Sequence, residues 1–206
     1  MEKDSPDPDA SGNRWSRLWQ KPDKWFLLGI PAGGYLLFIL GIGFWTSFNA
    51  FVEYSSNESF CISCHVMQAN VYEEYTQTNH YYNRTGVRAT CDDCHIPADW
   101  FAKVGRKMQA TMHEIPHWAL GTIDTREKFE ARRLFLAKRV WKRMKANDSR
   151  SCRNCHELDH MDLQVQQRSA RSKHTYRRQV DRGETCIDCH QGIAHKLPEG
   201  WEEVEI

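Results

Sequence analysis

Hydrophobic and polar positions divide the chain into one long apolar run and a longer, mixed remainder. No residue from Trp25 to Val52 is charged, and these 28 residues as a helix would span roughly 42 Å, more than the ~30 Å hydrocarbon core of a bilayer. The apolar region of a cleaved signal peptide is only about 7–15 residues long. The run therefore predicts an uncleaved transmembrane signal anchor over residues 25–52. A buried core helix is the alternative, but the rest of the chain is too polar to surround one.

The residues before the anchor predict its orientation. Basic residues and tryptophans alternate there, which is typical of the cytoplasmic end of a membrane span; they are Arg14, Trp15, Arg17, Trp19, Lys21, Lys24 and Trp25. We therefore expect residues 1–24 to form a cytoplasmic tail, which is polar and disordered over 1–13. Residues 53–206 are expected to lie in the periplasm of a bacterium, anchored to its inner membrane. Gly29 and Gly33 form a G-x-x-x-G pair of the kind that packs two helices into a homodimer.

Composition excludes little until the cysteines are located. The 206 residues include 28 Lys plus Arg and 27 Asp plus Glu, so a net charge of +1 argues neither for nucleic acid nor against it. An exported domain, however, would meet no DNA. All eight cysteines lie in four C-x-x-C-H pentads, which are Cys61-Ile-Ser-Cys64-His65, Cys91-Asp-Asp-Cys94-His95, Cys152-Arg-Asn-Cys155-His156 and Cys186-Ile-Asp-Cys189-His190.

This pentad is the attachment signature of c-type haem. Two thiols three positions apart reach the two vinyl groups of one porphyrin, and the adjacent histidine supplies the proximal nitrogen. The sequence therefore predicts four covalently bound haems. Zinc ribbons also use paired C-x-x-C units, but they do not require a histidine after each second cysteine. A disulfide inside each C-x-x-C would be strained. A structural or metal-binding protein without haem is one alternative function that this pattern leaves open.

The pentads form two similar halves, which predicts two dihaem repeats at about 58–121 and 149–206. In each half a lone histidine and a glycine turn separate the pentads, so His80 and His174 are equivalent. If a pseudo-twofold axis relates the halves, each lone histidine reaches a haem of the opposite half. His195 reaches the haem of the third pentad. The expected pairs are His80 with His190, His174 with His95, and His195 with His156.

The first pentad has no such distal histidine, because Ile96 to Trp100 contains none. Met67 lies two residues beyond His65, and its thioether could be the axial ligand. The alternative is that Met67 packs against the porphyrin, which leaves open whether His65 or Met67 binds the iron. The remaining histidines, His113, His117 and His160, have no counterpart and are expected to be surface or packing residues.

A basic helix is expected over about 122–147, joining the two repeats. Thr122, Asp124 or Thr125 can cap it. Between Asp124 and Lys145 the sequence contains nine basic residues and three acidic ones. Its charge is either a solvated face beside haem propionates or a docking face for an acidic partner. The rest should be short helices and loops packed on haem. The predicted fold class is thus mainly α, with one transmembrane helix and a haem-packed domain.

With these motifs the chain resembles the NapC/NirT family of membrane-anchored tetrahaem c-type cytochromes. The resemblance implies quinol oxidation, of menaquinol or ubiquinol, at the first haem, and electron transfer to a periplasmic reductase, with nitrate reductase first. It implies that Met67 is a ligand of that haem and that Asp99 lies at its open face. At position 98 this chain has alanine, whereas some relatives have histidine. The carrying segments are the anchor, Cys61 to Met67, Glu74 to Arg84, Asp93 to Pro97, Glu127 to Ala131, Cys152 to His156 and Gly192 to His195.

Quinol releases two protons, so its site needs a base. Asp99 could accept a proton or a hydrogen bond from the quinol hydroxyl. Lys103 recurs with Arg106 and Lys107 at helical spacing and could hold quinol or lipid headgroups. The alternatives are an exposed loop carboxylate and solvated helix charges. The second functional reading is an electron relay to nitrite or another reductase, which never contacts quinol.

Overall fold

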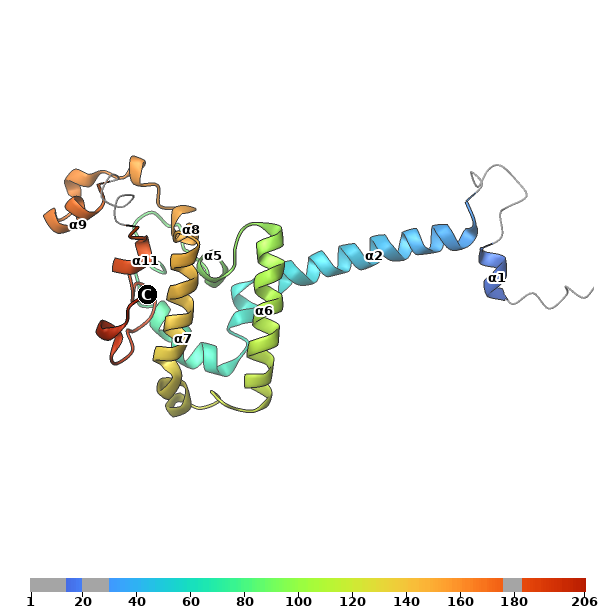
Figure 1. Ribbon diagram of the computed structural model, residues 1–206, viewed down its shortest axis with the longest axis horizontal. Coiled ribbons are helices and arrows are strands. Elements are labelled where there is room, and N and C mark those ends of the chain that lie inside the picture. The colour runs from blue at the N-terminus through green and yellow to red at the C-terminus, as the bar shows by residue number, and fades with distance from the viewer. Residues whose placement is uncertain (1–13, 20–29, 176–182) are drawn as a thin grey trace, which may run out of the picture. The chain divides into compact units, whose positions relative to one another are not determined.

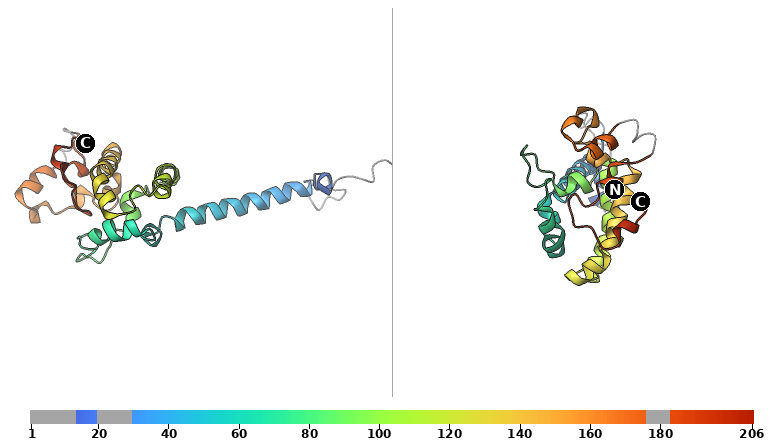
Figure 2. Two further views of the ribbon diagram at one scale, coloured as in Figure 1. Left: turned by 90° about the horizontal axis from the view of Figure 1, so that it is seen from below. Right: turned by 90° about the vertical axis from the view of Figure 1, so that its left-hand side faces the viewer.

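The computed structural model describes residues 14–19, 30–175 and 183–206, and the described residues form helices and loops without strands (Figures 1 and 2). This confirms the mainly helical class. The chain divides into two compact units, residues 1–54 and 55–206. The polar tail over 1–13 and Gly29 of the G-x-x-x-G pair lie outside the described residues.

The first unit contains the short helix α1 (Arg14–Leu18) and the long helix α2 (Ala32–Tyr54). α2 is long and apolar enough to cross a membrane. It begins directly after Pro31, since proline is tolerated at the start of a helix but not within it. Its side chains, such as Phe38 and Phe44, are mostly exposed, which suits lipid and not water. The helix ends two residues later than the predicted span of 25–52.

The second unit contains two long helices, α6 (Trp100–Ala119) and α7 (Arg126–Ala146), with short elements around them. The short helices include one for each pentad, and α11 packs against α7. The short elements are α3 (Glu58–Cys61), the π-helix η2 (Met67–Tyr72), α4 (Glu73–Tyr75), α5 (Cys91–His95), α8 (Arg150–Arg153), η3 (Leu158–His160), η4 (Leu163–Val165), α9 (Arg168–Lys173), α11 (Cys186–Cys189) and η5 (Trp201–Glu203).

α7 is the helix that the sequence places at 122–147. It begins at Arg126 because Thr125 is its cap, and the Thr125 hydroxyl accepts a hydrogen bond from Lys128 N at 3.3 Å. Gly121, with φ +57°, makes the turn between α6 and α7 in the left-handed region that favours glycine.

The second long helix, α6, corrects the expectation of only short helices outside 122–147. It has 20 residues, and Asp99 caps it by accepting a hydrogen bond from Ala102 N at 3.0 Å. Most of its apolar side chains are exposed, so it does not contribute a buried stripe to the unit.

Few hydrophobic side chains are buried in the second unit. The large ones in the described residues are Tyr75, Phe129, Trp141 and Ile187. Polar groups occupy much of the remaining interior, because Ser149, Glu74 and Arg133 are also buried. The polypeptide by itself therefore has a small apolar core for its length.

A buried ion pair links three segments of this unit. The Arg133 guanidinium of α7 donates to both carboxylate oxygens of Glu74 in α4, at 2.7 and 2.9 Å, and these side chains are only 8% and 5% exposed. Glu74 also accepts from Lys196 N at 2.9 Å, and Arg133 donates to Glu130 on its own helix at 2.7 Å. Burial alone would raise the pKa of Glu74, but the hydrogen bonds from Arg133 and Lys196 outweigh it and lower that pKa.

Replacement of Arg133 by methionine should leave Glu74 buried and without its cation. We expect Arg133→Met to lower the free energy of unfolding by about 3–5 kcal/mol. Arg132→Met is the matched control, because Arg132 is exposed on the same helix, and its effect should stay within about 0.5 kcal/mol. Denaturant unfolding of the haem-loaded protein, followed by circular dichroism, measures both. Equal effects of the two substitutions would contradict this role of the ion pair.

Candidate functional site

Two of the pentad helices are held by the same capping device. Thr90 N donates to Asp93 Oδ2 at 2.6 Å before α5, and Thr185 N donates to Asp188 Oδ2 at 2.6 Å before α11. Both boxes close reciprocally through the threonine side chain. The T-x-x-D spacing is readable in the sequence, although sequence reasoning missed it. Left-handed glycines also precede both helices, Gly86 and Gly183, and these likenesses support the proposed repeat.

The four pentads are neighbours in chain order. The Cys61 thiol is hydrogen-bonded to Cys91, which brings the first pentad to the second, and Cys152 is hydrogen-bonded to Cys186, which brings the third to the fourth. Cys94 and Cys155 are close enough to interact electrostatically, and α5 packs against α8. The second pentad therefore adjoins the third.

Three pentad histidines each have a second histidine ring beside them. His80 and His156 have ring centroids 6.1 Å apart with planes at 73°. The rings of His95 and His195 are 6.3 Å apart at 34°, and those of His174 and His190 are 5.8 Å apart at 22°. In the described part of the chain, no histidine ring lies in this way beside His65 of the first pentad.

These pairs correct the three expected ones. His80 lies beside His156 rather than His190, His195 beside His95 rather than His156, and His174 beside His190 rather than His95. The lone histidines are thus not used symmetrically, because different local contacts hold them.

Local hydrogen bonds explain the difference between the two lone histidines. The Tyr75 hydroxyl donates to the carbonyl of Ala89, and His80 O accepts from Ala89 N at 3.2 Å, which folds the loop that carries His80. His174 instead follows α9 and shares a hydrogen bond of 2.6 Å with Gln166 Oε1. His80 therefore crosses to the opposite half, whereas His174 stays in its own half.

Burial favours the neutral form, which binds metals, in four of the six paired histidines. It lowers the pKa of His95 to about 3 and also lowers the pKa of His80, His174 and His195. The neighbouring histidine lowers the pKa further in the cases of His80 and His174. A neutral imidazole has a free nitrogen lone pair, which is what a metal requires.

The spacing of the pairs fits an iron between the two rings. An imidazole nitrogen binds a transition metal at about 2 Å, so rings on opposite sides of one iron have centroids roughly 6 Å apart. The described residues contain no group of three or more His, Cys, Asp or Glu placed to hold a metal ion. A haem iron needs only two protein ligands, because the porphyrin provides the other four.

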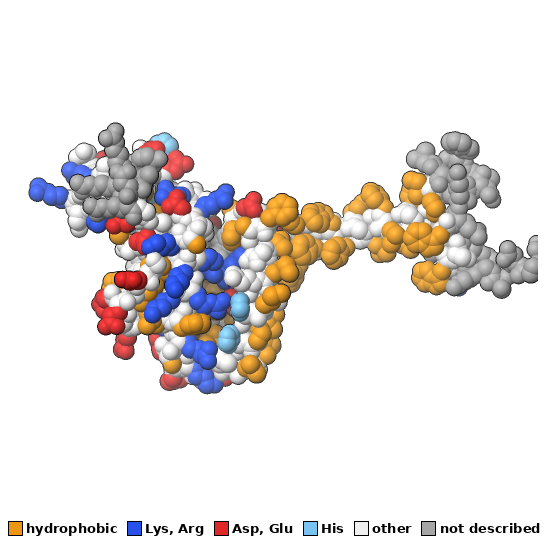
Figure 3. All heavy atoms as spheres, in the orientation of Figure 1, with side chains coloured by type: hydrophobic (Ala, Val, Ile, Leu, Met, Phe, Trp, Pro, Cys, Tyr) orange, Lys and Arg blue, Asp and Glu red, His pale blue; other side chains and the backbone are white. Residues whose placement is uncertain are grey.

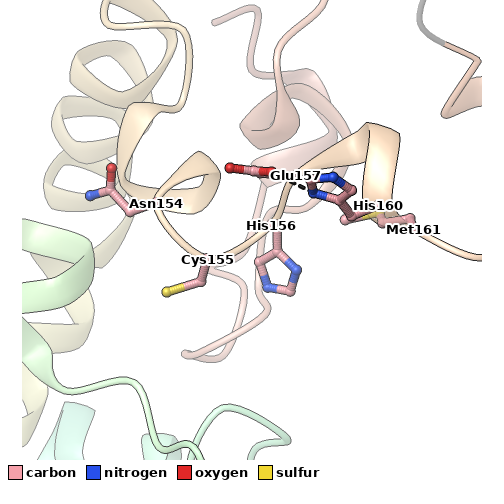
Figure 4. Close-up of a pocket in the computed structure, with 6 residues that line it drawn as sticks. All are labelled: Asn154, Cys155, His156, Glu157, His160 and Met161. Carbon is pink, nitrogen blue, oxygen red and sulfur yellow. Dashed lines mark ion pairs between the residues drawn. The ribbon is translucent and has the colours of Figure 1, made fainter.

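Two hollows are lined, one by sequence neighbours of His80 and the other by His156 itself. One of ≈ 540 Å³ is lined by Asn79, Tyr82, Asn83 and Arg84, which flank His80 in sequence. The other, of ≈ 250 Å³, is shown in Figure 4, where the His156 ring points downward from the chain and the Cys155 thiol points to the left. Its lining residues are Asn154, Cys155, His156, Glu157, His160 and Met161.

Two arginines near His95 have buried nitrogen atoms that could donate hydrogen bonds to an anion. Arg106 Nε and Arg143 Nη2 are buried and have no hydrogen-bond partner in the described residues. Both positive charges act on His95. Burial lowers the pKa of Arg143, and the charge of Arg106 lowers it further. Carboxylates such as haem propionates would satisfy both groups, so the residues around His95 fit a haem.

The first pentad differs from the others because, in the described residues, no second histidine ring lies beside its own. His65 and Met67 are both exposed, and Met67 begins the π-helix η2. Such π-helical turns often occur at functional sites. The charge of His65 acts on Asp124, close to the start of α7. Either His65 or Met67 is accessible to an iron held by Cys61 and Cys64.

Asp99 and Lys103, the residues expected at the quinol site, lie at the start of α6, Asp99 as its cap and Lys103 in its first turn. The contacts of Asp99 in the described part of the chain are those of a helix cap, with Ala102 N and, through its carbonyl, with Lys103 N. α6 does pass the first pentad further along, because the charge of Lys107 acts on Cys61. The structure therefore brings Lys107 of α6, but not the Asp99 side chain itself, within electrostatic range of this pentad.

The other three histidines are not part of the three ring pairs. His113 and His160 are exposed, and His160 Nδ1 is 2.6 Å from Glu157 Oε2. His117 shares a hydrogen bond of 2.9 Å with Thr122 Oγ1 at the end of α6.

A single serine joins the third and fourth pentads. Ser149 has no exposed surface and a φ of +49°, an uncommon backbone conformation for a residue with a side chain. Its hydroxyl accepts a hydrogen bond from Ile187 N, at 3.2 Å, so the start of α8 is tied to α11. Sequence reasoning missed this residue, because the bond joins positions 38 apart.

The chain is similar to known cytochromes. Residues 26–200 match the model of the NapC/NirT cytochrome c family, N-terminal region. The chain is 50% identical to the denitrification system component NirT of Stutzerimonas stutzeri over 202 residues, which covers 95% of this chain and 97% of that protein. It is 48% identical to the cytochrome c-type protein NapC of Escherichia coli K12 over 191 residues, covering 92% and 91%.

A third relative has its haem content in its name. The chain is 48% identical over 163 residues to a putative tetraheme cytochrome-c type protein of Allochromatium vinosum, covering 79% of this chain and 86% of that protein. No solved structure matches the chain.

Replacement of Ser149 by alanine should leave Ile187 N buried and without an acceptor. We expect Ser149→Ala to lower the free energy of unfolding by about 1–3 kcal/mol. Ser151→Ala, two residues along in α8, is the control and should change it by less than about 0.5 kcal/mol. Thermal or denaturant unfolding of the haem-loaded protein provides the comparison, and a neutral Ser149→Ala would show that the tie is dispensable.

Proposed function

Because the chain belongs to the NapC/NirT cytochrome c family, we propose that it is a membrane quinol dehydrogenase of the electron-transport chain. Membership makes it a c-type cytochrome with covalently bound haem. The proposal adds four haems, the oxidation of menaquinol or ubiquinol, a periplasmic haem domain, and delivery of electrons to a periplasmic reductase. Nitrate reductase is the first acceptor to test, since the relatives include NapC and a denitrification component.

The observation that carries the proposal is the difference between the first pentad and the other three. Three pentads have a second histidine about 6 Å away, which would close both faces of an iron. In the described residues the first has no second histidine ring beside His65, and Met67 follows two residues later instead. Closed sites suit electron transfer, and an open one suits reaction with a small molecule.

The residues divide into three roles. Covalent attachment falls to Cys61, Cys64, Cys91, Cys94, Cys152, Cys155, Cys186 and Cys189. The irons would be held by His95 with His195, His156 with His80, and His190 with His174, and by His65 or Met67 at the first site. Arg106 and Arg143 would bind propionates beside His95. Each haem, when bound, supplies a carrier of one electron, and the chain-order contacts of the pentads would hold four such carriers in a row.

Asp99 and Lys103 would manage the protons and the position of quinol. The Asp99 carboxylate uses Oδ1 to cap α6, which leaves its second oxygen to accept a proton from a quinol hydroxyl. Lys103, one turn later, would orient the quinol or hold the charge of the carboxylate. Both residues begin the helix that passes Cys61, which supports a site at the first pentad.

Asp99→Asn separates the two roles of this side chain, because asparagine caps helices as well as aspartate does. We expect the variant to keep its helix but to lose most of the rate of haem reduction by quinol, by about 10²–10⁴-fold as for loss of a general base. Stopped-flow absorption of the detergent-purified protein, mixed with a reduced quinol analogue, measures this rate. Reduction by dithionite should be unchanged.

Asp162→Asn is the matched control, because Asp162 caps η4 in the same manner, accepting from Gln164 N at 2.9 Å. It should reduce as fast as the wild type. Reduction of the wild type by dithionite but not by quinol would overturn the dehydrogenase and leave the relay that another protein reduces.

The angles between ring planes predict distinct spectra. In a low-spin ferric haem with two histidines, nearly perpendicular rings give a highly anisotropic electron paramagnetic resonance signal, whereas nearly parallel rings give an ordinary rhombic one. His80→Ala should therefore remove an anisotropic signal, since its pair lies at 73°, and His174→Ala a rhombic one, since its pair lies at 22°. Imidazole added to each variant should restore low-spin iron. Loss of the same signal in both variants would contradict these pairs.

A further inference from the structure

α6 is amphipathic, and its apolar face is turned outward. Phe101, Met108, Met112 and Ile115 are 79%, 57%, 68% and 54% exposed. Their spacing of seven, four and three residues places them on one face of the helix. In Figure 3 a row of hydrophobic side chains follows α6 along its length.

The opposite face of α6 is polar and turned inward. Lys103, Arg106, Lys107 and His117 lie on it, and all four are partly buried. The Arg106 side chain is only 14% exposed and pairs with Glu114 at 3.2 Å. A surface helix of a water-soluble protein shows the reverse arrangement, with its apolar face inward. The environment outside α6 must therefore be apolar for this helix to be stable as it stands.

A hydrogen bond ties α6 to the point where the chain leaves the membrane span. Lys107 Nζ donates to Ser55 Oγ at 2.8 Å. Ser55 directly follows Tyr54, the last residue of α2. Since the end of a span lies at the membrane surface, the middle of α6 is held one hydrogen bond from a residue at that surface.

We propose that α6 is an interfacial helix whose face of Phe101, Met108, Met112 and Ile115 is immersed in the acyl chains of the membrane that α2 anchors. The lipid bilayer is the occupant, because it is the one apolar phase that the chain itself brings to Ser55. Trp118 and Leu120, 73% and 76% exposed at the end of the helix, would sit at the headgroup boundary, where tryptophan is enriched. This inference rests on the proposed membrane anchoring and not on quinol oxidation.

Photo-crosslinking to lipid tests the inference. The haem-loaded full chain would be placed in vesicles of phosphatidylcholine that carries a diazirine near the end of one acyl chain, irradiated, digested and mapped by mass spectrometry. We expect adducts on α2 and on the apolar face of α6. Phe135 and Val165, which are 56% and 82% exposed elsewhere in the domain, should carry none.

The positions of the adducts separate failure of the inference from failure of the anchor. Adducts on α2 but not on α6 would overturn the interfacial helix and leave the anchor intact, whereas absence from both would overturn the anchor too. Met112→Glu should abolish the adducts on α6 without changing those on α2, and Phe135→Glu should change neither. Protein–protein cross-links through the α6 face would assign it to a second copy or another protein, and would overturn the proposal.

Discussion

The haem domain depends on burying more apolar surface than its own side chains provide. Tyr75, Phe129, Trp141 and Ile187 are few large side chains for a unit of residues 55–206, and burial of apolar area is the main favourable term in folding. Covalent porphyrins would supply the missing area. Such a chain consists of short helices that each carry one attachment pentad. Its loops are held by polar contacts, such as the one between Glu74 and Arg133.

This constraint also divides what the sequence could predict from what it could not. The pentads, the apolar span and the capped basic helix are local patterns, so residue types and spacing were enough to locate them. The partner of each pentad histidine is a long-range feature. It depends on Tyr75 reaching Ala89 and on Gln166 reaching His174, which no repeat in the sequence encodes. The assumption of a symmetric exchange identified three candidate histidines but assigned them to the wrong pentads.

α6 shows a second limit of pattern reading. The helical spacing of Lys103, Arg106 and Lys107 indicated a helix, yet its length of 20 residues was missed. An amphipathic period has the same repeat whether its apolar face meets a protein core or a bilayer. The period therefore gives the helix and not the side that faces inward. Only the contacts of the polar face, such as Lys107 with Ser55, distinguish the two.

The asymmetry of the four sites follows from the same two features. Histidine pairs would close three irons on both faces, which keeps their ligands fixed on a change of charge and offers a substrate no position. In the described residues no second histidine ring lies beside the first pentad, and the charge of Lys107 of α6 acts on its Cys61. If the outer face of α6 meets lipid, the one open site lies where a lipid-soluble quinol arrives, and the closed sites continue from it in chain order toward the aqueous side. One helix would then set both the depth of the domain at the membrane and the end of the chain of haems at which electrons enter.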